Sequence, residues 1–229
     1  MNVEVIIGHH VSDDEHRSTA REWVTGWYTA RGYQVTTGVA TGTVWCKAQA
    51  FNDAVAASTA DVVVLADADS FPLADALTEA IDRVARVGWA APFHRVRRLS
   101  RAATAQLLER DPARTDIPPD VRLEAEVHDI LPGGGIVVMD RQLAVDCGPF
   151  DPRFAGYGGE DFALGNAART FCGNYAYVST AGVLFHLWHP RAGAMSADTK
   201  HLVNRYRLAK FDADRMRALI DEWRRHGAG

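Results

Sequence analysis

The sequence predicts an α/β protein in which a mostly parallel sheet is flanked by helices, followed by a C-terminal helical extension. Short apolar runs typical of buried strands alternate with segments whose apolar residues recur at helical spacing. One such run, residues 62–66, ends abruptly in Asp67, Ala68 and Asp69. No GxGxxG follows the first apolar run and no GxxxxGK[ST] occurs, so the common dinucleotide-binding and P-loop classes are disfavoured.

Length and charge restrict the class of protein further. A chain of 229 residues fits one large domain, or a core with an appended subdomain. The net charge of −4 argues against a broad polyanion-binding surface and leaves room for a local basic patch. The three cysteines form no CxxC pair, which favours a reducing compartment. The first residues lead directly into a strand pattern, so we expect neither a signal peptide nor a membrane anchor.

The first half of the chain alternates strands and helices. A capping box at Ser12 and Glu15 predicts where the first helix begins, Gly32 predicts its end, and Pro72 predicts the start of the third helix. The expected elements are a strand at 3–7, a helix from the capping box to Gly32, a strand at 33–37, a helix at 45–57, a strand at 62–66, a helix from Pro72, and a strand at 89–92.

The second half carries more irregular sequence. The basic run HRVRRLSR, residues 94–101, reads most simply as a solvated face, although it could contact phosphates. Residues 109–120 contain three prolines and predict a mobile loop, conceivably a lid. Three consecutive glycines, residues 133–135, precede a strand at 136–139 and would allow close backbone approach to a ligand, or act as a hinge. Strand patterns at 175–178 and 183–189 and final helical patterns complete the chain.

Three groups of polar residues are candidates for chemistry. Asp67 and Asp69 are two apart, so on an extended strand both side chains point the same way and suit a hard divalent cation; a solvated acidic turn is the alternative. Glu160 and Asp161 follow three glycines in FAGYGGEDF and begin a helical pattern. His186 and His189 in HLWHP can bind one metal only if the chain bends between them.

In this order, the motifs resemble those of inverting glycosyltransferases of the GT-A (Rossmann-like) fold. The nearest likeness is to the β-1,4-galactosyltransferase-like group and family 2-like bacterial relatives, and rests on KAQAFN, DAD, GYGGED and HxxH. It spans residues 1–190, with a nucleotide-sugar half at about 1–93 and an acceptor half at about 94–190, and leaves 191–229 as the helical extension.

The resemblance implies roles for individual residues. Asp161 corresponds to the catalytic base, and Glu160 beside it contacts the acceptor. The implied metal ligands are Asp69 and His189, with His186 and Asp67 as further candidates. The implied donor-binding residues are Gly8, Arg17, Lys47, Asn52, Asp67 and Asp69, and the acceptor-binding residues are Gly158, Gly159, Glu160 and Trp188.

The predicted function is metal-dependent transfer of a hexose, galactose or glucose, from a UDP-sugar to an acceptor hydroxyl with inversion. Mixed imidazole and carboxylate ligands favour Mn²⁺ over Mg²⁺. The expected acceptor is a saccharide or glycolipid, with a hydroxymethylated base in DNA as the alternative. The expected location is the cytoplasm, and the expected origin is bacterial or viral. Two rival interpretations are a haloacid dehalogenase-type phosphatase, disfavoured because its aspartate lies on the first strand, and a noncatalytic sugar- or nucleotide-binding module.

Overall fold

The protein is described by a computed structural model, which places residues 1–117, 123–128, 133–173, 176–177, 182–190 and 193–226. The strands are β1 Val3–His10, β2 Gln34–Ala40, β3 Val62–Asp67, β4 Ser70–Pro72, β5 Trp89–Ala91, β6 Arg95–Leu99, β7 Leu123–His128, β8 Ile136–Asp140, β9 Ala176–Tyr177 and β10 Val183–His186. The helices are α1 Glu15–Thr29, α2 Lys47–Ala57, α3 Ala74–Val87, α4 Arg101–Leu108, α5 Arg141–Cys147, α6 Glu160–Cys172, α7 Ala197–Ala209 and α8 Ala213–His226, with a short 3₁₀ turn at Pro112–Arg114.

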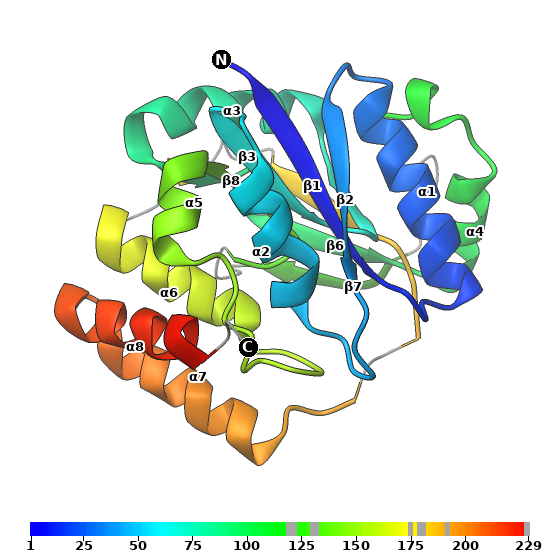
Figure 1. The fold of residues 1–229 in the computed structure, drawn as a ribbon. Helices are drawn as coiled ribbons and strands as arrows, with labels where there is room; N and C mark the ends of the chain where they lie inside the picture. The colour runs from blue at the N-terminus through cyan, green and yellow to red at the C-terminus, as the bar shows by residue number, and fades with distance from the viewer. Residues whose placement is uncertain (118–122, 129–132, 174–175, 178–181, 191–192, 227–229) are drawn as a thin grey trace.

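Two sheets organise these elements (Figure 1). The larger sheet has the order β2-β1-β3-β8-β5-β9, in which β1 runs parallel to β2 and β3. Within it β8 runs antiparallel to both β3 and β5, so the parallel arrangement is interrupted once. A second, smaller sheet has the order β4-β10-β6-β7 and was not expected from the sequence. It places residues 95–99 of the basic run in strand β6, where Arg98 is exposed as expected of a solvated face.

The inner strands β1, β3 and β8 of the larger sheet have both faces buried. Val5, Ile7 and Val64 pack with α1 and α3, whereas Ile6 and Val63 pack with α2 on the other face. Helices α5, α6, α7 and α8 extend that second layer, as the lower left of Figure 1 shows. Successive side chains of a strand point to opposite faces of the sheet, so a strand that is covered on both faces is apolar at every position. This explains the uninterrupted apolar run of β3.

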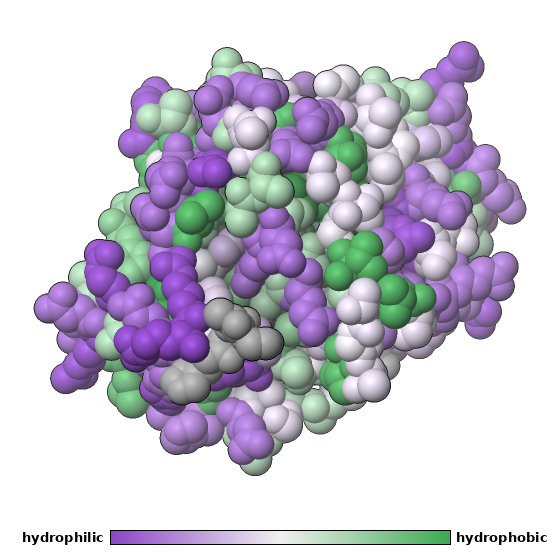
Figure 2. Space-filling view, viewed as in Figure 1, coloured by the Kyte–Doolittle hydropathy of each residue, from purple (hydrophilic) through white to green (hydrophobic). Residues whose placement is uncertain are grey.

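The C-terminal helices are amphipathic. The inner face of α8 is buried in the same core as α6, through Met216, Leu219, Ile220 and Trp223. Hydrophilic side chains cover the outer surface at the lower left, where α8 lies (Figure 2). Within the described part of the chain, no helix combines the length and apolar character needed to cross a bilayer.

Two predicted helix starts are wrong. Helix α1 is capped by the Asp14 carboxylate, which accepts from the Arg17 amide at 2.9 Å. The predicted cap, Ser12, instead places its hydroxyl 2.6 Å from His10 Nδ1. Pro72 is the last residue of β4, and α3 begins at Ala74 after Leu73, because the turn following β3 leads into an additional strand.

The described part of the predicted lid, residues 109–117, is hydrogen-bonded to side chains of and next to helix α1. Trp23 Nε1 donates to the Arg110 carbonyl at 2.9 Å, and Trp27 Nε1 donates to the Thr115 carbonyl at 3.0 Å. Arg31 adds a hydrogen bond to that Thr115 carbonyl at 3.1 Å. Residues 109–117 are therefore bound to α1 rather than hinged over a site, while residues 118–120 of the predicted loop lie outside the described residues.

Candidate functional site

The turn after β3 separates the two acids of the DAD motif. Strand β3 ends at Asp67, and Ala68 and Asp69 form a turn that leads to Ser70 and β4. The expectation that both carboxylates point the same way is therefore wrong, because it assumed that the strand continues to Asp69. Asp69 is buried and faces two histidines, whereas Asp67 contacts Lys47 and the Gly135 amide.

Asp69, His186 and His189 form a compact group with one donor atom each. Within the described residues, these are the side chains whose donor atoms lie together as metal ligands would, all within 4.8 Å of one another. His186 Nε2 lies 3.8 Å and His189 Nε2 lies 3.3 Å from the Asp69 carboxylate. The bend required between the two histidines is present. Strand β10 ends at His186, and the irregular residues that follow place the centres of the two imidazole rings 5.2 Å apart.

The surroundings of His189 favour a neutral imidazole. Burial lowers the pKa of His189, although Asp69 opposes this. Its Nδ1 lies 2.7 Å from the Pro190 carbonyl, which can only accept, and 3.0 Å from Arg17 Nη2, which can only donate, so the tautomer of His189 decides which of these two contacts is a hydrogen bond. Burial alone would raise the pKa of Asp69, but His186, His189 and Arg17 together lower it and keep the carboxylate ionised.

A second group of charges lies beside the first and centres on Lys47. The Lys47 side chain is only 6% exposed, and its Nζ lies 2.7 Å from Asp67 Oδ1 and 2.7 Å from Asp161 Oδ1. Its ammonium also lies 5.0 Å from the ring centre of Phe150 and 5.7 Å from that of Phe51. Burial alone would lower the pKa of Lys47, but the carboxylates raise it, so the lysine remains charged and bridges the two acids.

The three glycines bring Asp67 and Asp161 together. Gly135 N donates to Asp67 Oδ2 at 3.1 Å, and Asp67 N donates to the Gly135 carbonyl at 2.7 Å. A Cβ on Gly133 would lie 2.0 Å from the Asp161 carbonyl, and one on Gly134 would lie 2.8 Å from Asp161 Oδ2. The close backbone approach predicted for this segment is therefore toward the first turn of α6.

Asp161 has the protonation behaviour expected of a general base near neutrality. Burial raises its pKa to about 7, against the opposing effect of Lys47 and with smaller contributions from Glu160 and Asp67. Burial also raises the pKa of Glu160, whose Oε2 is buried and has no hydrogen-bond partner within the described residues. A carboxylate close to a pKa of 7 is matched to proton transfer at physiological pH.

Two of the predicted donor-binding residues, Gly8 and Asn52, make structural contacts. Gly8 lies on β1 where a Cβ would fall 2.2 Å from the Phe51 ring, so its small size permits α2 to pack against the strand. The Asn52 amide donates to the Phe150 carbonyl at 2.7 Å and accepts from the Phe150 amide at 3.1 Å. Asn52 therefore fixes the segment before GYGGED.

The predicted acceptor-binding residues lie on two segments. Gly158 and Gly159 have positive φ values of 86° and 99°, so this turn into α6 requires glycine. Trp188 lies between the two histidines of HLWHP, and its amide donates to Thr104 Oγ1 at 2.8 Å.

Neither the Lys47–Asp161 ion pair nor the second sheet was predicted from the sequence. Both depend on contacts between segments that are far apart along the chain, 114 residues in the case of the ion pair. The available signal was a lysine at the start of an amphipathic helix, a position that is ordinarily solvated.

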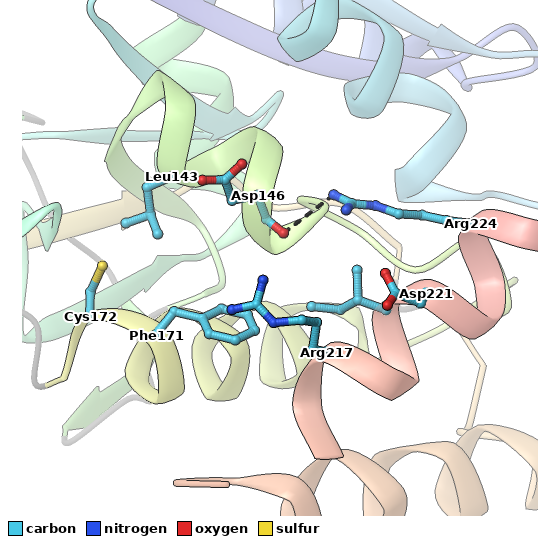
Figure 3. A pocket seen from close by; sticks show the side chains of 8 residues that line it. Leu143, Asp146, Phe171, Cys172, Arg217, Asp221 and Arg224 are labelled. Atoms are coloured by element: carbon cyan, nitrogen blue, oxygen red, sulfur yellow. Dashed lines mark hydrogen bonds between the residues drawn. The ribbon is translucent and has the colours of Figure 1, made fainter. Parts of the chain in front are cut away.

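A separate cavity of about 360 Å³ lies between α5, α6 and α8 (Figure 3). Arg217 stacks over Phe171 there, with its guanidinium carbon 5.3 Å from the ring centre, and Arg224 donates to the Asp146 carbonyl at 3.3 Å. None of the candidate site residues lines this cavity.

Comparisons with known proteins show a likeness in fold at low sequence identity. No known protein family matches the sequence, and no curated protein matches it. The structure is similar to a Drosophila β-1,4-galactosyltransferase 7 mutant in complex with manganese, UDP-Gal and xylobiose, with TM-score 0.52 and 12% identity over 89% of this chain and 79% of that chain. It is also similar to GalNAc-T7 with UDP, GalNAc and Mn²⁺, with TM-score 0.55 and 13% identity over 98% of this chain and 54% of that chain. The chain therefore has the GT-A fold of these glycosyltransferases.

Proposed function

We propose that the protein is a glycosyltransferase that transfers a hexose, galactose or glucose, from a UDP-sugar to an acceptor hydroxyl with inversion. Asp161 is the general base, Glu160 contacts the acceptor, and Asp69, His186 and His189 hold a divalent cation. The observation that carries the proposal is that three side chains able to hold a metal ion and a carboxylate with a pKa of about 7 lie at the edge of the larger sheet where β3 ends. Ligands of open α/β sheets bind at that edge, beyond the carboxyl ends of the strands.

The donor set fits the proposed cation. Two imidazole nitrogens and one carboxylate oxygen suit Mn²⁺ better than Mg²⁺, which prefers oxygen ligands and retained waters. When bound, the cation would neutralise negative charge on the leaving nucleoside diphosphate. Arg17, which lies 3.0 Å from His189, supplies a permanent positive charge at the same place.

Asp161 supplies the proton transfer. The attacking hydroxyl must lose its proton as the bond to the anomeric carbon forms, and an ionised Asp161 within hydrogen-bond reach accepts it. Lys47 holds this carboxylate in place at 2.7 Å and keeps Asp67 beside it. Glu160 adjoins the base, and its Oε2 atom is buried and has no hydrogen-bond partner among the described residues, so we assign Glu160 the contact with an acceptor hydroxyl.

The nucleotide and the acceptor class are inferred by analogy. Both structures that carry the fold likeness contain uridine nucleotides and manganese, which supports a UDP-sugar and Mn²⁺. Their sugar ligands, xylobiose in one and GalNAc in the other, support a saccharide-type acceptor or product. A DNA acceptor finds no support in these comparisons and is not proposed.

The test is release of UDP from a panel of UDP-sugars with and without Mn²⁺, paired with thermal melting under the same conditions. One UDP-sugar should raise Tm only with Mn²⁺, and His189→Ala should abolish that metal-dependent shift. The anomeric configuration of the product, read by NMR, should be opposite to that of the donor. If no UDP-sugar shifts Tm or releases UDP, the proposal is wrong; binding without any transfer would favour a noncatalytic module.

A further inference from the structure

The basic run 94–101 divides between the two faces of the smaller sheet. Arg97 Nε donates to Glu126 Oε2 at 2.8 Å, and Arg95 Nη1 lies 4.0 Å from the same carboxylate. Alternation over residues 95–98, before the irregularity that follows Arg98 in the pairing of β6 with β7, places Arg98 on the opposite face from Arg97. Glu126 therefore neutralises one half of the run, while Arg98 is directed elsewhere.

Arg98 lies beside the proposed metal ligands. In the smaller sheet, β10 is paired with β4 on one side and β6 on the other, and His186 is in register with Ser70 and with Arg98. The side chains of residues in register on neighbouring strands project from the same face, and the strands themselves lie roughly 5 Å apart. Because His186 faces Asp69, the Arg98 side chain leaves the sheet on the face that carries the metal-binding group.

Arg101 is the first residue of helix α4 and contacts the segment between His186 and His189. Its guanidinium carbon lies 5.1 Å from the centre of the Trp188 ring. His16 packs edge-on against the same ring at 5.2 Å, and Thr104 holds the Trp188 amide at 2.8 Å. Arg101 is thereby kept next to HLWHP, with its charge exposed at the rim of the site.

Both arginines are exposed, and no carboxylate pairs with either of them in the described part of the chain. This local excess of positive charge contrasts with the net charge of −4. Guanidinium groups bind phosphate and carboxylate oxygens through paired hydrogen bonds. We propose that Arg98 and Arg101 form a subsite for an anionic group, a phosphate or a carboxylate, carried by the acceptor; this rests on the proposed glycosyltransferase function.

The position of Arg98 favours the acceptor over the donor diphosphate as the source of the anion. A nucleotide bound at the carboxyl ends of β1 and β3 reaches Asp69 from the β4 side of the smaller sheet. Arg98 lies on β6, which flanks β10 on the side away from β4. On the donor side, Arg17 already lies beside His189.

The test compares Arg98→Gln and Arg101→Gln with the matched control Arg97→Gln, which alters the same strand on its opposite face. UDP release with Mn²⁺ is measured with acceptor pairs that differ by one anionic group: glycerol and glycerol 3-phosphate, glucose and glucose 6-phosphate, glucose and glucuronate. We expect the anionic member of a pair to be preferred. Its KM should rise about tenfold or more in Arg98→Gln and Arg101→Gln, and stay unchanged in the control.

Calorimetric titration with UDP and Mn²⁺ separates the possible sources of the anion. The dissociation constant of UDP should change less than twofold in either variant. Weaker UDP binding would assign the arginines to the donor and overturn the proposal, as would equal use of neutral and anionic acceptors. If the wild-type protein neither binds nor releases UDP, the glycosyltransferase function is wrong. In that case, direct titration of the wild-type protein with the same anionic compounds tests the subsite. If an anionic compound binds and Arg98→Gln abolishes the binding, the anion subsite is supported. If none of the compounds binds, the subsite is wrong.

Discussion

Asp161 is subject to two opposing influences that decide its usefulness as a base. Its side chain is 35% exposed and ion-paired with Lys47, yet burial of the carboxylate raises its pKa to about 7. A base acts only when it is ionised, and here the ionised fraction falls tenfold per pH unit below the raised pKa. We therefore predict that kcat/KM declines as pH falls below about 7, and that Asp161→Asn reduces transfer by about a thousandfold or more while UDP still binds.

A pH–rate profile and a UDP titration measure these effects. The residual activity of Asp161→Asn should lack the decline below pH 7, because the titrating group is gone. A profile that is flat between pH 5 and 8 in the wild-type protein, or unchanged transfer by the variant, would remove Asp161 from the role of base.

Lys47 supports the site by holding two carboxylates that would otherwise repel. Lys47→Met leaves Asp67 and Asp161 without their common partner, and we predict a loss of about 2–3 kcal/mol in the free energy of unfolding. The loss is at the low end of that for buried ion pairs, because the two carboxylates are 30% and 35% exposed. Urea unfolding measures it, with Lys200→Met on the exposed face of α7 as the control. Equal stability of the two variants would contradict a structural role for the ion pair.

Some features of the candidate site could be predicted from the sequence and others could not, for physical reasons. The grouping of Asp69, His186 and His189 could be anticipated because the resemblance to GT-A glycosyltransferases implied all three as metal ligands. The divergence of Asp67 from Asp69 could not, because it depends on a turn that the alternation rule does not foresee. Asn52 resembles a ligand contact in sequence, and only the structure shows both ends of its amide on the Phe150 backbone.

At the scale of elements, the glycine segment before β8 sets the position of the base. Gly134→Ala would place a Cβ 2.8 Å from Asp161 Oδ2, and the flexible carboxylate must move to relieve the contact. We predict that kcat falls about a hundredfold, since small misplacement of a catalytic group has effects of that size. Thermal melting should show little change. Gly193→Ala is the matched control, because nothing lies within 4 Å of its added Cβ. Full activity in Gly134→Ala would show that the carboxylate position is not critical.

The local sequence predicted the strands and helices better than their partners. Apolar runs and helical periodicity located β1, β3, β8, α1 and α3, since these signals are carried within each segment. The direction of β8 and the pairing of β6 with β10 depend on how long connections return, which a single sequence does not encode locally. Helix α1 shows the same limit at short range, because Asp14 and Ser12 are both good caps and the contact of Ser12 with His10 favours Asp14.

At the scale of the whole molecule, the C-terminal helices complete the second core layer. Tyr206 and Trp223 pack in the cluster that contains α6, and the Tyr206 hydroxyl donates to Asp151 Oδ2 at 2.9 Å. An ion pair of 2.6 Å joins Arg153 to Glu222 on α8. Residues beyond position 190 thus hold the segment around Asp151 and Arg153, which precedes GYGGED.

A chain that ends at residue 196 should consequently fail to fold, although the resemblance in sequence ends near residue 190. Removing α7 and α8 exposes the apolar face of α6 and leaves the buried Asp151 without its tyrosine donor. The predicted result is loss of cooperative thermal unfolding by near-ultraviolet circular dichroism. Met216→Ala in the full chain tests the same contact more gently: it should cost about 2–5 kcal/mol, against under about 0.5 kcal/mol for the exposed Arg215→Ala. If the shortened chain melts cooperatively near the wild-type Tm, residues 191–229 are an appendage and the site rests on the first 190 residues alone.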